Sequence, residues 1–360
     1  MRVALVHDFI KDGGAERVLV ALHDLFPEAP VYTLIPHAPG SLYDAWDVRP
    51  IGPVAWLPMR FYHAGVLLYP VLMDRLDLAG FDVVISSSVS WAKAARVTPP
   101  AVHLCYCHRP MMFAYERQDD FLRSYPMPLR LLARAIVPML RRWDLRTADR
   151  PTLYLANSRY TAGRVRRLYN REARVIYPPV DTAAFPLAHR SQDSYLVVSR
   201  LVAYKRIDVA VESFNRLGLP LVIVGDGPER RRLADMAGAT VRLVGYQTDA
   251  QLRDWYASCR AFVFPSEDDF GIAPVEAQAC GKPVIAYRGG GVLETVREGE
   301  TGVFFDVQEP EALAAAVRRS QRMTFEPEAI RQHAQQFGVG RFRREIREVF
   351  AACTRGAGQG

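Results

Sequence analysis

The sequence is poor in cysteine and has no apolar run as long as a membrane span. Its cysteines are odd in number and lack the spacing of a metal site: Cys105, Cys107, Cys259, Cys280 and Cys353. This pattern excludes a small disulfide-built domain and favours a reduced, cytosolic setting. Met1 and Arg2 lead directly into an apolar strand, so we expect no signal peptide.

Other patterns are missing as well. Neither Gly13-Gly14 nor the glycine turn at 225–227 has the three-glycine spacing of a dinucleotide site, which argues against a dehydrogenase. The pairs Asp119-Asp120 and Asp268-Asp269 lack the spaced partner of a metal-binding Asp-x-Asp, so we expect no metal site. No recognition motif accompanies the basic charge, so we expect no nucleic-acid partner.

What remains is a chain of 360 residues, 49% hydrophobic and 24% charged. That length suits two soluble domains of roughly 150 to 180 residues each. A net charge of +7 and a pI near 9.2 favour phosphate-bearing partners, whether nucleotide, nucleic acid or anionic lipid.

The most informative stretch runs from Phe262 to Thr295. An apolar run at 261–264 predicts a buried strand, and a helix is expected from Pro274, with Gly281 as its stop. A second strand at 283–287 leads into Gly289-Gly290-Gly291 and another helix. Two successive strand–loop–helix units would thus direct backbone N–H groups into one crevice, which is how an α/β protein holds a phosphate.

Three acids lie beside this crevice: Glu267, Asp268 and Asp269. Carboxylates do not bind phosphate, so we expect them to face sugar hydroxyls or a developing positive charge. Phe270-Gly271 follows, where the backbone can turn tightly or approach a ligand.

The stretch resembles the signature of glycosyltransferase family 4, the retaining nucleotide-sugar transferases of the GT-B fold. The family signature has two glutamates with seven residues between them, and Phe-Gly two and three places after the first. Registering on Phe270-Gly271 places Asp268 at the first acid, one methylene shorter than the family's glutamate, and Glu276 at the second. Glu267, one place earlier, could partly substitute. The resemblance implies that Asp268 holds donor-sugar hydroxyls and that Glu276 accepts from the nucleotide ribose.

In the first half, a strand at 3–7 and a loop to Gly14 precede a helix expected at 15–25. A glycine pair alone more often marks an ordinary strand-to-helix turn. The resemblance implies instead that Gly13 and Gly14 lie close to the donor diphosphate, as in the family's glycine-rich first loop.

His108 ends the strand at 102–107, and ligands bind at the carboxyl ends of strands in open α/β sheets. His108-Arg109-Pro110 also resembles the family's His-x-Pro motif, which contacts the transferred sugar. We therefore expect His108 to act at the active site and His103 to be a core histidine.

Residues 123–150 carry seven arginines against two aspartates, interleaved with leucines and other apolar residues. This pattern fits a basic amphipathic surface for an anionic membrane as well as it fits a domain-edge helix with a solvated charged face. Pro126, Pro128 and Pro138 predict two helical pieces rather than one. An unusually apolar stretch at 54–78 lies in the same half.

The second half begins with a strand at 195–199. Arg200 and Lys205 follow it and can bracket a diphosphate, as the family's arginine and lysine do. Gly225 opens a glycine turn expected beside the nucleotide. The backbone amides of Gly271 and Ile272 would complete the diphosphate site.

We therefore predict an α/β protein of the GT-B fold, with two Rossmann-like α/β/α domains facing each other across a cleft. The acceptor-binding domain spans 1–187, the donor-binding domain spans 188–338, and a helix within 339–360 crosses back to the first domain.

The resemblance implies a retaining mannosyltransferase that moves mannose from GDP-mannose to a saccharide acceptor, one linked to a polyprenyl diphosphate in bacterial surface-polysaccharide assembly. It implies no cofactor or metal, and a cytoplasmic protein at the inner face of the membrane. The alternatives are a UDP-sugar transferase of the same family, a nucleotide-sugar epimerase of the GT-B fold and a non-catalytic basic binding protein.

Overall fold

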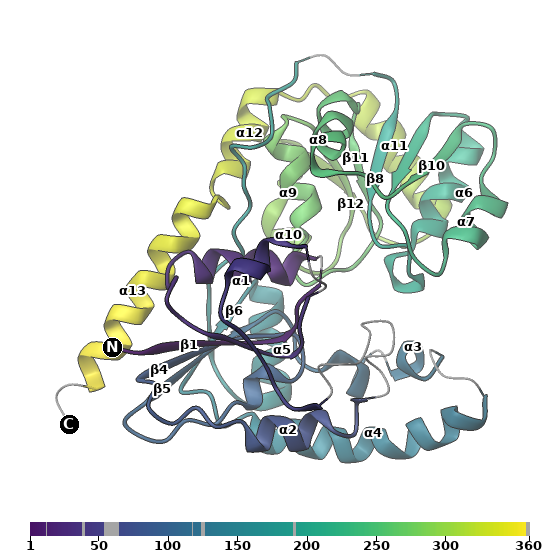
Figure 1. Ribbon diagram of the computed structural model, residues 1–360. Helices are drawn as coiled ribbons and strands as arrows, with labels where there is room; N and C mark the ends of the chain where they lie inside the picture. The colour runs from purple at the N-terminus through teal and green to yellow at the C-terminus, as the bar shows by residue number, and fades with distance from the viewer. Residues whose placement is uncertain are drawn as a thin grey trace. The chain divides into compact units, whose positions relative to one another are not determined.

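The computed structural model describes residues 1–11, 13–37, 40–53, 65–116, 118–123, 127–189 and 192–357. Contacts divide the chain into two compact units, Met1–Tyr177 with Arg343–Gly360, and Pro178–Phe342 (Figure 1). The first unit thus ends at Tyr177, whereas the sequence suggested a boundary near residue 187. The predicted α/β fold of two parallel-sheet units is confirmed.

The described strands of the first unit form one parallel sheet in the order β3-β2-β1-β4-β5-β6-β7. Their bounds are β1 Val3–Phe9, β2 Val31–Ile35, β3 Val48–Pro50, β4 Val83–Ser88, β5 Val102–Cys107, β6 Leu153–Ala156 and β7 Ala173–Val175. The central strands β1, β4 and β5 are buried on both faces, which explains their near-continuous runs of buried side chains.

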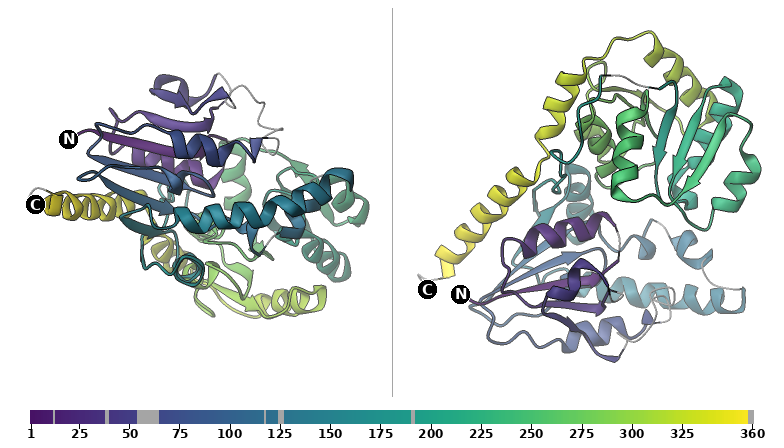
Figure 2. Two further views of the ribbon diagram at one scale, coloured as in Figure 1. Left: turned by 90° about the horizontal axis from the view of Figure 1, so that it is seen from below. Right: turned by 45° about the horizontal axis from the view of Figure 1, so that its top comes forward.

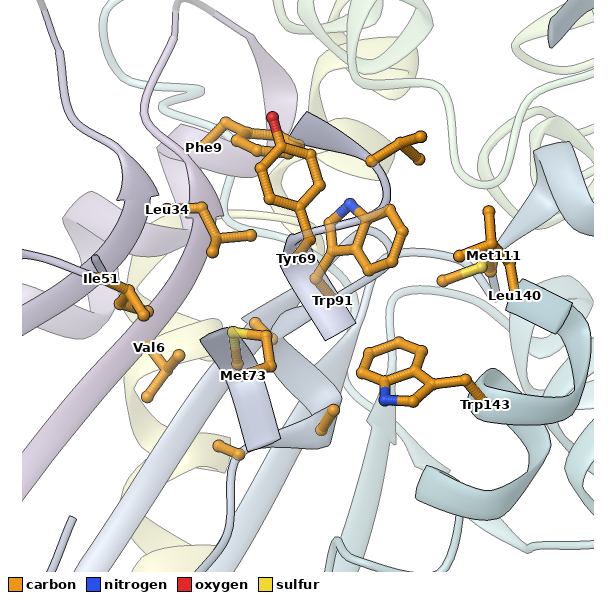
Figure 3. Close-up of a cluster of buried hydrophobic side chains, with 14 of the residues drawn as sticks. Val6, Phe9, Leu34, Ile51, Tyr69, Met73, Trp91, Met111, Leu140 and Trp143 are labelled. Carbon is orange, nitrogen blue, oxygen red and sulfur yellow. The ribbon is translucent and has the colours of Figure 1, made fainter. Parts of the chain in front are cut away.

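Helices cover both faces of this sheet (Figure 1). They are α1 Gly14–His23, α2 Tyr69–Arg75, α3 Gln118–Arg123, α4 Met127–Thr147, α5 Arg159–Tyr169 and the greater part of α13 Val339–Ala357, with short 3₁₀ turns η1 Leu42–Ala45, η4 Ala92–Ala94 and η5 Met112–Ala114. A buried aromatic and aliphatic cluster joins α2 and α4 to the sheet, with Tyr69, Trp91 and Trp143 at its centre (Figure 3).

Helix α4 corrects one expectation. It runs without a break through Pro138, so this proline does not end the helix. Pro138 lies on the exposed side of α4, so the carbonyl group that it leaves without an N–H partner can be hydrated. Pro128 is tolerated because it falls in the first turn, where N–H groups have no intrahelical partner. The side chains of Leu129 and Leu132, and residues 54–64 of the apolar stretch, lie outside the described residues.

The second unit has a parallel sheet of order β10-β9-β8-β11-β12-β13. Its strands are β8 Tyr195–Val198, β9 Leu221–Val224, β10 Val241–Gly245, β11 Phe262–Phe264, β12 Val284–Tyr287 and β13 Gly302–Phe305. Its helices are the 3₁₀ turn η6 Ala203–Lys205, then α6 Ile207–Leu217, α7 Arg230–Met236, α8 Asp249–Ser258, α9 Ile272–Ala279, α10 Val292–Thr295, α11 Pro310–Gln321 and α12 Pro327–Gln335.

The C-terminal segment forms two helices, α12 and α13, as the sequence indicated. Most of α13 belongs to the first unit by its contacts. Arg343 forms an ion pair with Asp24, and Phe350 packs on Phe26 at 4.8 Å between ring centroids. None of the described helices is both long and apolar enough to cross a membrane.

Candidate active site

Both sheets reverse their strand order once, and these reversals locate the candidate sites. In the second unit the chain proceeds from β8 outward to β9 and β10, then returns to β11 on the other side of β8. In the first unit the same reversal separates β1 from β4. In open parallel sheets, ligands bind beside the carboxyl ends of strands at such a switch point.

Two of the predicted basic residues follow β8 at this reversal in the second unit. Arg200 is exposed, with no ion-pair partner among the described residues. Lys205 lies on the next 3₁₀ turn, and its ammonium group forms an ion pair with the carboxylate of Asp268, which follows β11. The structure therefore brings together two predicted site residues that are 63 positions apart.

The glycine turn after β9 packs against the chain around Arg200. Gly225 has φ +129°, and a Cβ atom there would lie 1.9 Å from the carbonyl oxygen of Ser199. The amide of Leu201 donates to the carbonyl of Asp226 over 2.9 Å. The close approach of the Gly225 turn to the chain beside Arg200 thus depends on a position that only glycine can occupy.

A second close backbone contact joins the loops after β11 and β12. The amide of Gly291 donates to the carbonyl of Asp268 over 2.8 Å. Added Cβ atoms at Gly290 and Gly291 would each lie 2.3 Å from a carbonyl oxygen of the neighbouring loop. The two glycine loops that the sequence indicated are therefore side by side.

Helix α9 begins at Ile272, two residues earlier than expected from Pro274. Its N-cap is Gly271, with φ +89° in the left-handed region. Pro274 is the third helical residue, where the missing N–H costs no intrahelical hydrogen bond. The amides of Gly271 and Ile272 thus lie at the start of α9, as the predicted diphosphate contact requires.

Glu276 lies on α9 and is only 2% exposed. Its Oε2 accepts a hydrogen bond of 2.7 Å from the hydroxyl of Tyr256 on α8. Tyr256 is fully buried and packs on Phe185 and Phe262. Tyr256 could not be linked to Glu276 from the sequence, because the contact depends on how α8 packs against α9.

In the first unit, His108 follows β5 and is 8% exposed. Its Nε2 lies 2.8 Å from the hydroxyl of Ser87 at the end of β4, and its carbonyl accepts from the side chain of Asn157. Burial lowers the pKa of His108 well below its ordinary value, and the charges of His7 and Arg109 lower it further. His108 is therefore a neutral hydrogen-bonding group near neutral pH.

The loop after β4 is fixed by Asp8, a buried residue near the end of β1. The carboxylate of Asp8 accepts backbone hydrogen bonds from Val89, Ser90, Trp91 and Ala92. The four amides lie more than 80 residues further along the chain, so the sequence did not indicate this contact.

Gly13 and Gly14 lie at the start of α1, where the predicted glycine loop was placed. Glu16 of the same turn is 4% exposed and lies 3.6 Å from Nε2 of His7. A Cβ atom at Gly13 would lie 2.9 Å from Oε2 of Glu16. This carboxylate disfavours a diphosphate at the turn, so Gly13 and Gly14 have less structural support than the residues of the second unit.

Lys93 and Asp144 form a buried ion pair that the sequence did not indicate. Their charged atoms are 3.1 Å apart, and the side chains are 2% and 0% exposed. Tyr115 donates to Asp144, and Thr147 accepts from Lys93. The pair joins η4 to α4 beneath the sheet and has a structural role. His103 is also buried, hydrogen-bonded to Ser86, which fits the expected core histidine.

No group of three or more metal-ligating side chains occurs in the described part of the chain. The polar groups of the second-unit site are basic side chains, backbone amides and two separate carboxyl groups.

Comparison with known proteins identifies the family to which the chain belongs. Residues 12–184 match the Glycosyltransferase Family 4 pattern, and residues 182–337 match that of Glycosyl transferases group 1. The chain belongs to glycosyltransferase family 4.

Two relatives show how this family-4 chain is related to curated proteins. A D-inositol 3-phosphate glycosyltransferase of Nocardiopsis dassonvillei is 37% identical over 122 residues, which are 32% of this chain and 28% of that protein. A GDP-mannose-dependent alpha-mannosyltransferase of Corynebacterium glutamicum is 38% identical over 121 residues, 33% of this chain and 29% of that protein. The matched segments thus span less than a third of either relative.

The fold has a counterpart among solved structures. Anabaena Alr3699/HepE in complex with UDP superposes with a TM-score of 0.74 at 18% identity, covering 98% of this chain and 100% of that one. At this identity the likeness concerns the fold alone.

Proposed function

We propose that this family-4 protein is a retaining glycosyltransferase that moves mannose from GDP-mannose to a lipid-linked saccharide acceptor. The observation that supports transfer most directly is the set of groups at the switch point of the second unit. Arg200, Lys205 and the amides at the start of α9 offer positive charge, while Asp268 and Glu276 offer acceptors for hydroxyl groups.

The chemistry assigns these groups different work. When the bond from the sugar C1 to the diphosphate breaks, negative charge accumulates on the diphosphate, and Arg200 and Lys205 would neutralise it. Asp268 would bind hydroxyls of the donor sugar, and Glu276 would bind those of the ribose. Neutral His108 would orient the sugar through a hydrogen bond rather than through charge.

The ion pair of Lys205 with Asp268 adds a step to the binding of the donor. A diphosphate that binds Lys205 competes with Asp268 for the ammonium group. Donor binding would therefore release the Asp268 carboxylate, which then becomes available to the sugar hydroxyls. The basic residues would supply the electrostatic stabilisation without a metal ion.

The choice of mannose and guanosine rests on similarity to the mannosyltransferase of C. glutamicum, which is limited to part of the chain. A UDP-sugar donor is the second candidate, because the fold also matches a protein solved with UDP. A polyprenyl-diphosphate-linked acceptor at the inner face of the membrane would fit the basic, apolar first unit.

A thermal-shift screen tests the proposal with GDP, UDP, ADP, CDP and their sugar conjugates. We expect stabilisation by GDP and GDP-mannose that is lost in Arg200→Ala and Lys205→Ala. Asp268→Asn should instead bind GDP about fivefold more tightly, because the competing carboxylate is gone, while transfer of mannose slows. Asp306→Asn, at an exposed ion pair with Arg288, is the matched control.

The outcomes separate the alternatives. Stabilisation by UDP alone would retain the reaction class and discard GDP-mannose. No response to any nucleotide would overturn the transferase proposal and favour a binding protein. Release of free sugar without an acceptor would favour an epimerase or hydrolase.

A further inference from the structure

Strongly exposed large apolar side chains are concentrated in one part of the first unit. Seven of the twelve such side chains among the described residues belong to α4 or to residues 67–71, which lead into α2 and form its first turn. They are Leu67, Leu68, Val71, Met127, Leu131, Met139 and Leu145. Scattered apolar residues are normal on a protein surface, but this concentration is not.

Helix α4 has two apolar sides. Ala133, Val137 and Leu140 are buried and pack into the core at the spacing of one helix face. Met127, Leu131 and Leu145 lie on the opposite face, and Leu131 is 73% exposed. The 19 residues from Met127 to Leu145 extend this outer face over about 27 Å.

Helix α2 lies beside α4 in Figures 1 and 2. Asp74 of α2 accepts from the indole N–H of Trp143 and forms ion pairs with Arg146 and Arg150. Both helices contribute to the same core cluster, so their outward faces border one surface. We call Met127, Leu131, Arg134, Met139, Arg142 and Leu145 the α4 surface.

The charge on this surface has one sign. Arg134 and Arg142 are exposed, and neither has an ion-pair partner among the described residues. The acid within α4, Asp144, is fully buried and paired with Lys93. The outer face of α4 therefore presents arginines and apolar side chains together, without an exposed carboxylate to balance them.

This combination of apolar and basic side chains distinguishes between the partners that could cover the α4 surface. A second copy of the chain would bring two arginine faces together, which repels. Nucleic acid would pair with the arginines but would leave exposed leucine and methionine side chains in water. An anionic bilayer accepts both, because apolar side chains enter the interface while arginines contact lipid phosphates.

We propose that the α4 surface docks this protein on an anionic phospholipid bilayer. The inference deepens the proposed function, because a lipid-linked acceptor would lie at that bilayer. Its test measures binding to vesicles and needs no enzymatic turnover.

The test is flotation of the full-length protein with vesicles of phosphatidylcholine, with and without phosphatidylglycerol. We expect binding only to the anionic vesicles at about 0.05 M salt, and strong weakening at about 0.5 M. Arg134→Gln and Arg142→Gln should each weaken binding about fivefold. Leu131→Gln should weaken it at least about fivefold, because an inserted leucine is lost.

Matched controls lie in the second unit. Arg318→Gln changes the same charge on the exposed face of α11, and Val307→Gln changes a residue that is 52% exposed. Both should bind vesicles like the unaltered protein. The thermal shift with nucleotide should be the same in all variants, so loss of docking is distinguishable from failure of the proposed activity.

Three results would overturn the proposal. One is the absence of binding to anionic vesicles at low salt. Another is equal loss of binding in the Arg318→Gln control. The third is a change of partner: duplex DNA bound through Arg134 and Arg142 regardless of Leu131, or a dimer in sedimentation that Leu131→Gln dissociates.

Discussion

The hydrogen bond from Tyr256 to Glu276 gives the predicted ribose acceptor a fixed position. Glu276 is buried on α9, and Tyr256 reaches it from α8 across 2.7 Å. A carboxyl group held by a rigid, buried partner loses little conformational freedom when a ligand binds it. We infer that Tyr256 is a positioning residue that acts through Glu276.

Replacing Tyr256 by phenylalanine tests this inference. The variant keeps the ring packing but removes a hydrogen bond to a carboxyl group, worth about 1.5–3 kcal/mol. We expect the nucleotide Kd, measured by calorimetry, to rise at least about tenfold.

The control is Tyr154→Phe, which removes a hydroxyl that is similarly buried and bonded to the carbonyl of Ala148 in the first unit. It should lower stability without changing the nucleotide Kd. If Tyr256→Phe lowers stability alone and leaves the Kd unchanged, Tyr256 is merely a packing residue.

Individual candidate residues of the site were easier to predict from sequence than the residues that contact them. Arg200, Lys205, Asp268 and Glu276 could be selected as candidate site residues because they follow strands at family-like spacing. Tyr256 could not, since the contact depends on how α8 packs against α9. The buried pair of Lys93 with Asp144 was hidden for the same reason, in a segment where charge suggested only surface.

The turn after β9, which positions Arg200, depends on backbone contacts so close that they leave no room for a Cβ atom. Gly225 and Gly227 pack their α-carbons against the carbonyls of Ser199 and Leu201. These contacts fix the path of the chain on both sides of Arg200. The turn therefore fixes the backbone position from which the Arg200 side chain extends, although the turn itself contributes no charge.

We expect Gly225→Ala to destabilise the second unit by about 3 kcal/mol or more, because a Cβ atom would lie 1.9 Å from backbone oxygen at φ +129°. The nucleotide-induced thermal shift should be lost with it. Urea unfolding monitored by Trp255 fluorescence measures the first effect.

Gly218→Ala is the matched comparison. Gly218 also has positive φ, +64°, but nothing lies within 4 Å of the added atom. It should cost only about 1 kcal/mol from backbone strain and leave nucleotide binding intact. Equal costs for the two variants would show that steric exclusion at the turn is unimportant.

Most strands and helices could be predicted from sequence because each is a buried apolar run or a strongly periodic segment. The errors fall at prolines. Pro274 was taken as the first residue of its helix and is the third, and Pro138 was expected to interrupt a helix that continues through it. In both cases the missing N–H costs little, at a helix start or beside solvent, and sequence alone does not show which situation applies.

Across the whole molecule, buried histidines link stability to pH. Burial lowers the pKa of His23, His103, His108 and His333, which lie in both units. The pKa of His103 falls to about 3, against an ordinary value of about 6.5 in an unfolded chain. The unfolded protein therefore takes up protons below pH 6.5 that the folded protein does not.

The sign of the effect follows from this difference. The stability associated with a neutral buried histidine is fully present above pH 6.5 and is lost progressively as the pH falls towards the folded-state pKa. For His103 alone, lowering the pH from 6.5 to 5 should reduce the free energy of unfolding by about 2 kcal/mol. Urea unfolding at pH 7 and pH 5 measures the loss.

The variant His103→Gln separates this contribution from all others. Its stability at pH 7 will be lower, because the core around Ser86 is altered, but the further loss between pH 7 and pH 5 should be about 2 kcal/mol smaller than in the unaltered protein. His189→Gln, at an exposed position, should leave that loss unchanged. An identical loss in His103→Gln and the unaltered protein would show that His103 takes up its proton in the folded state, and that burial in β5 does not keep it neutral.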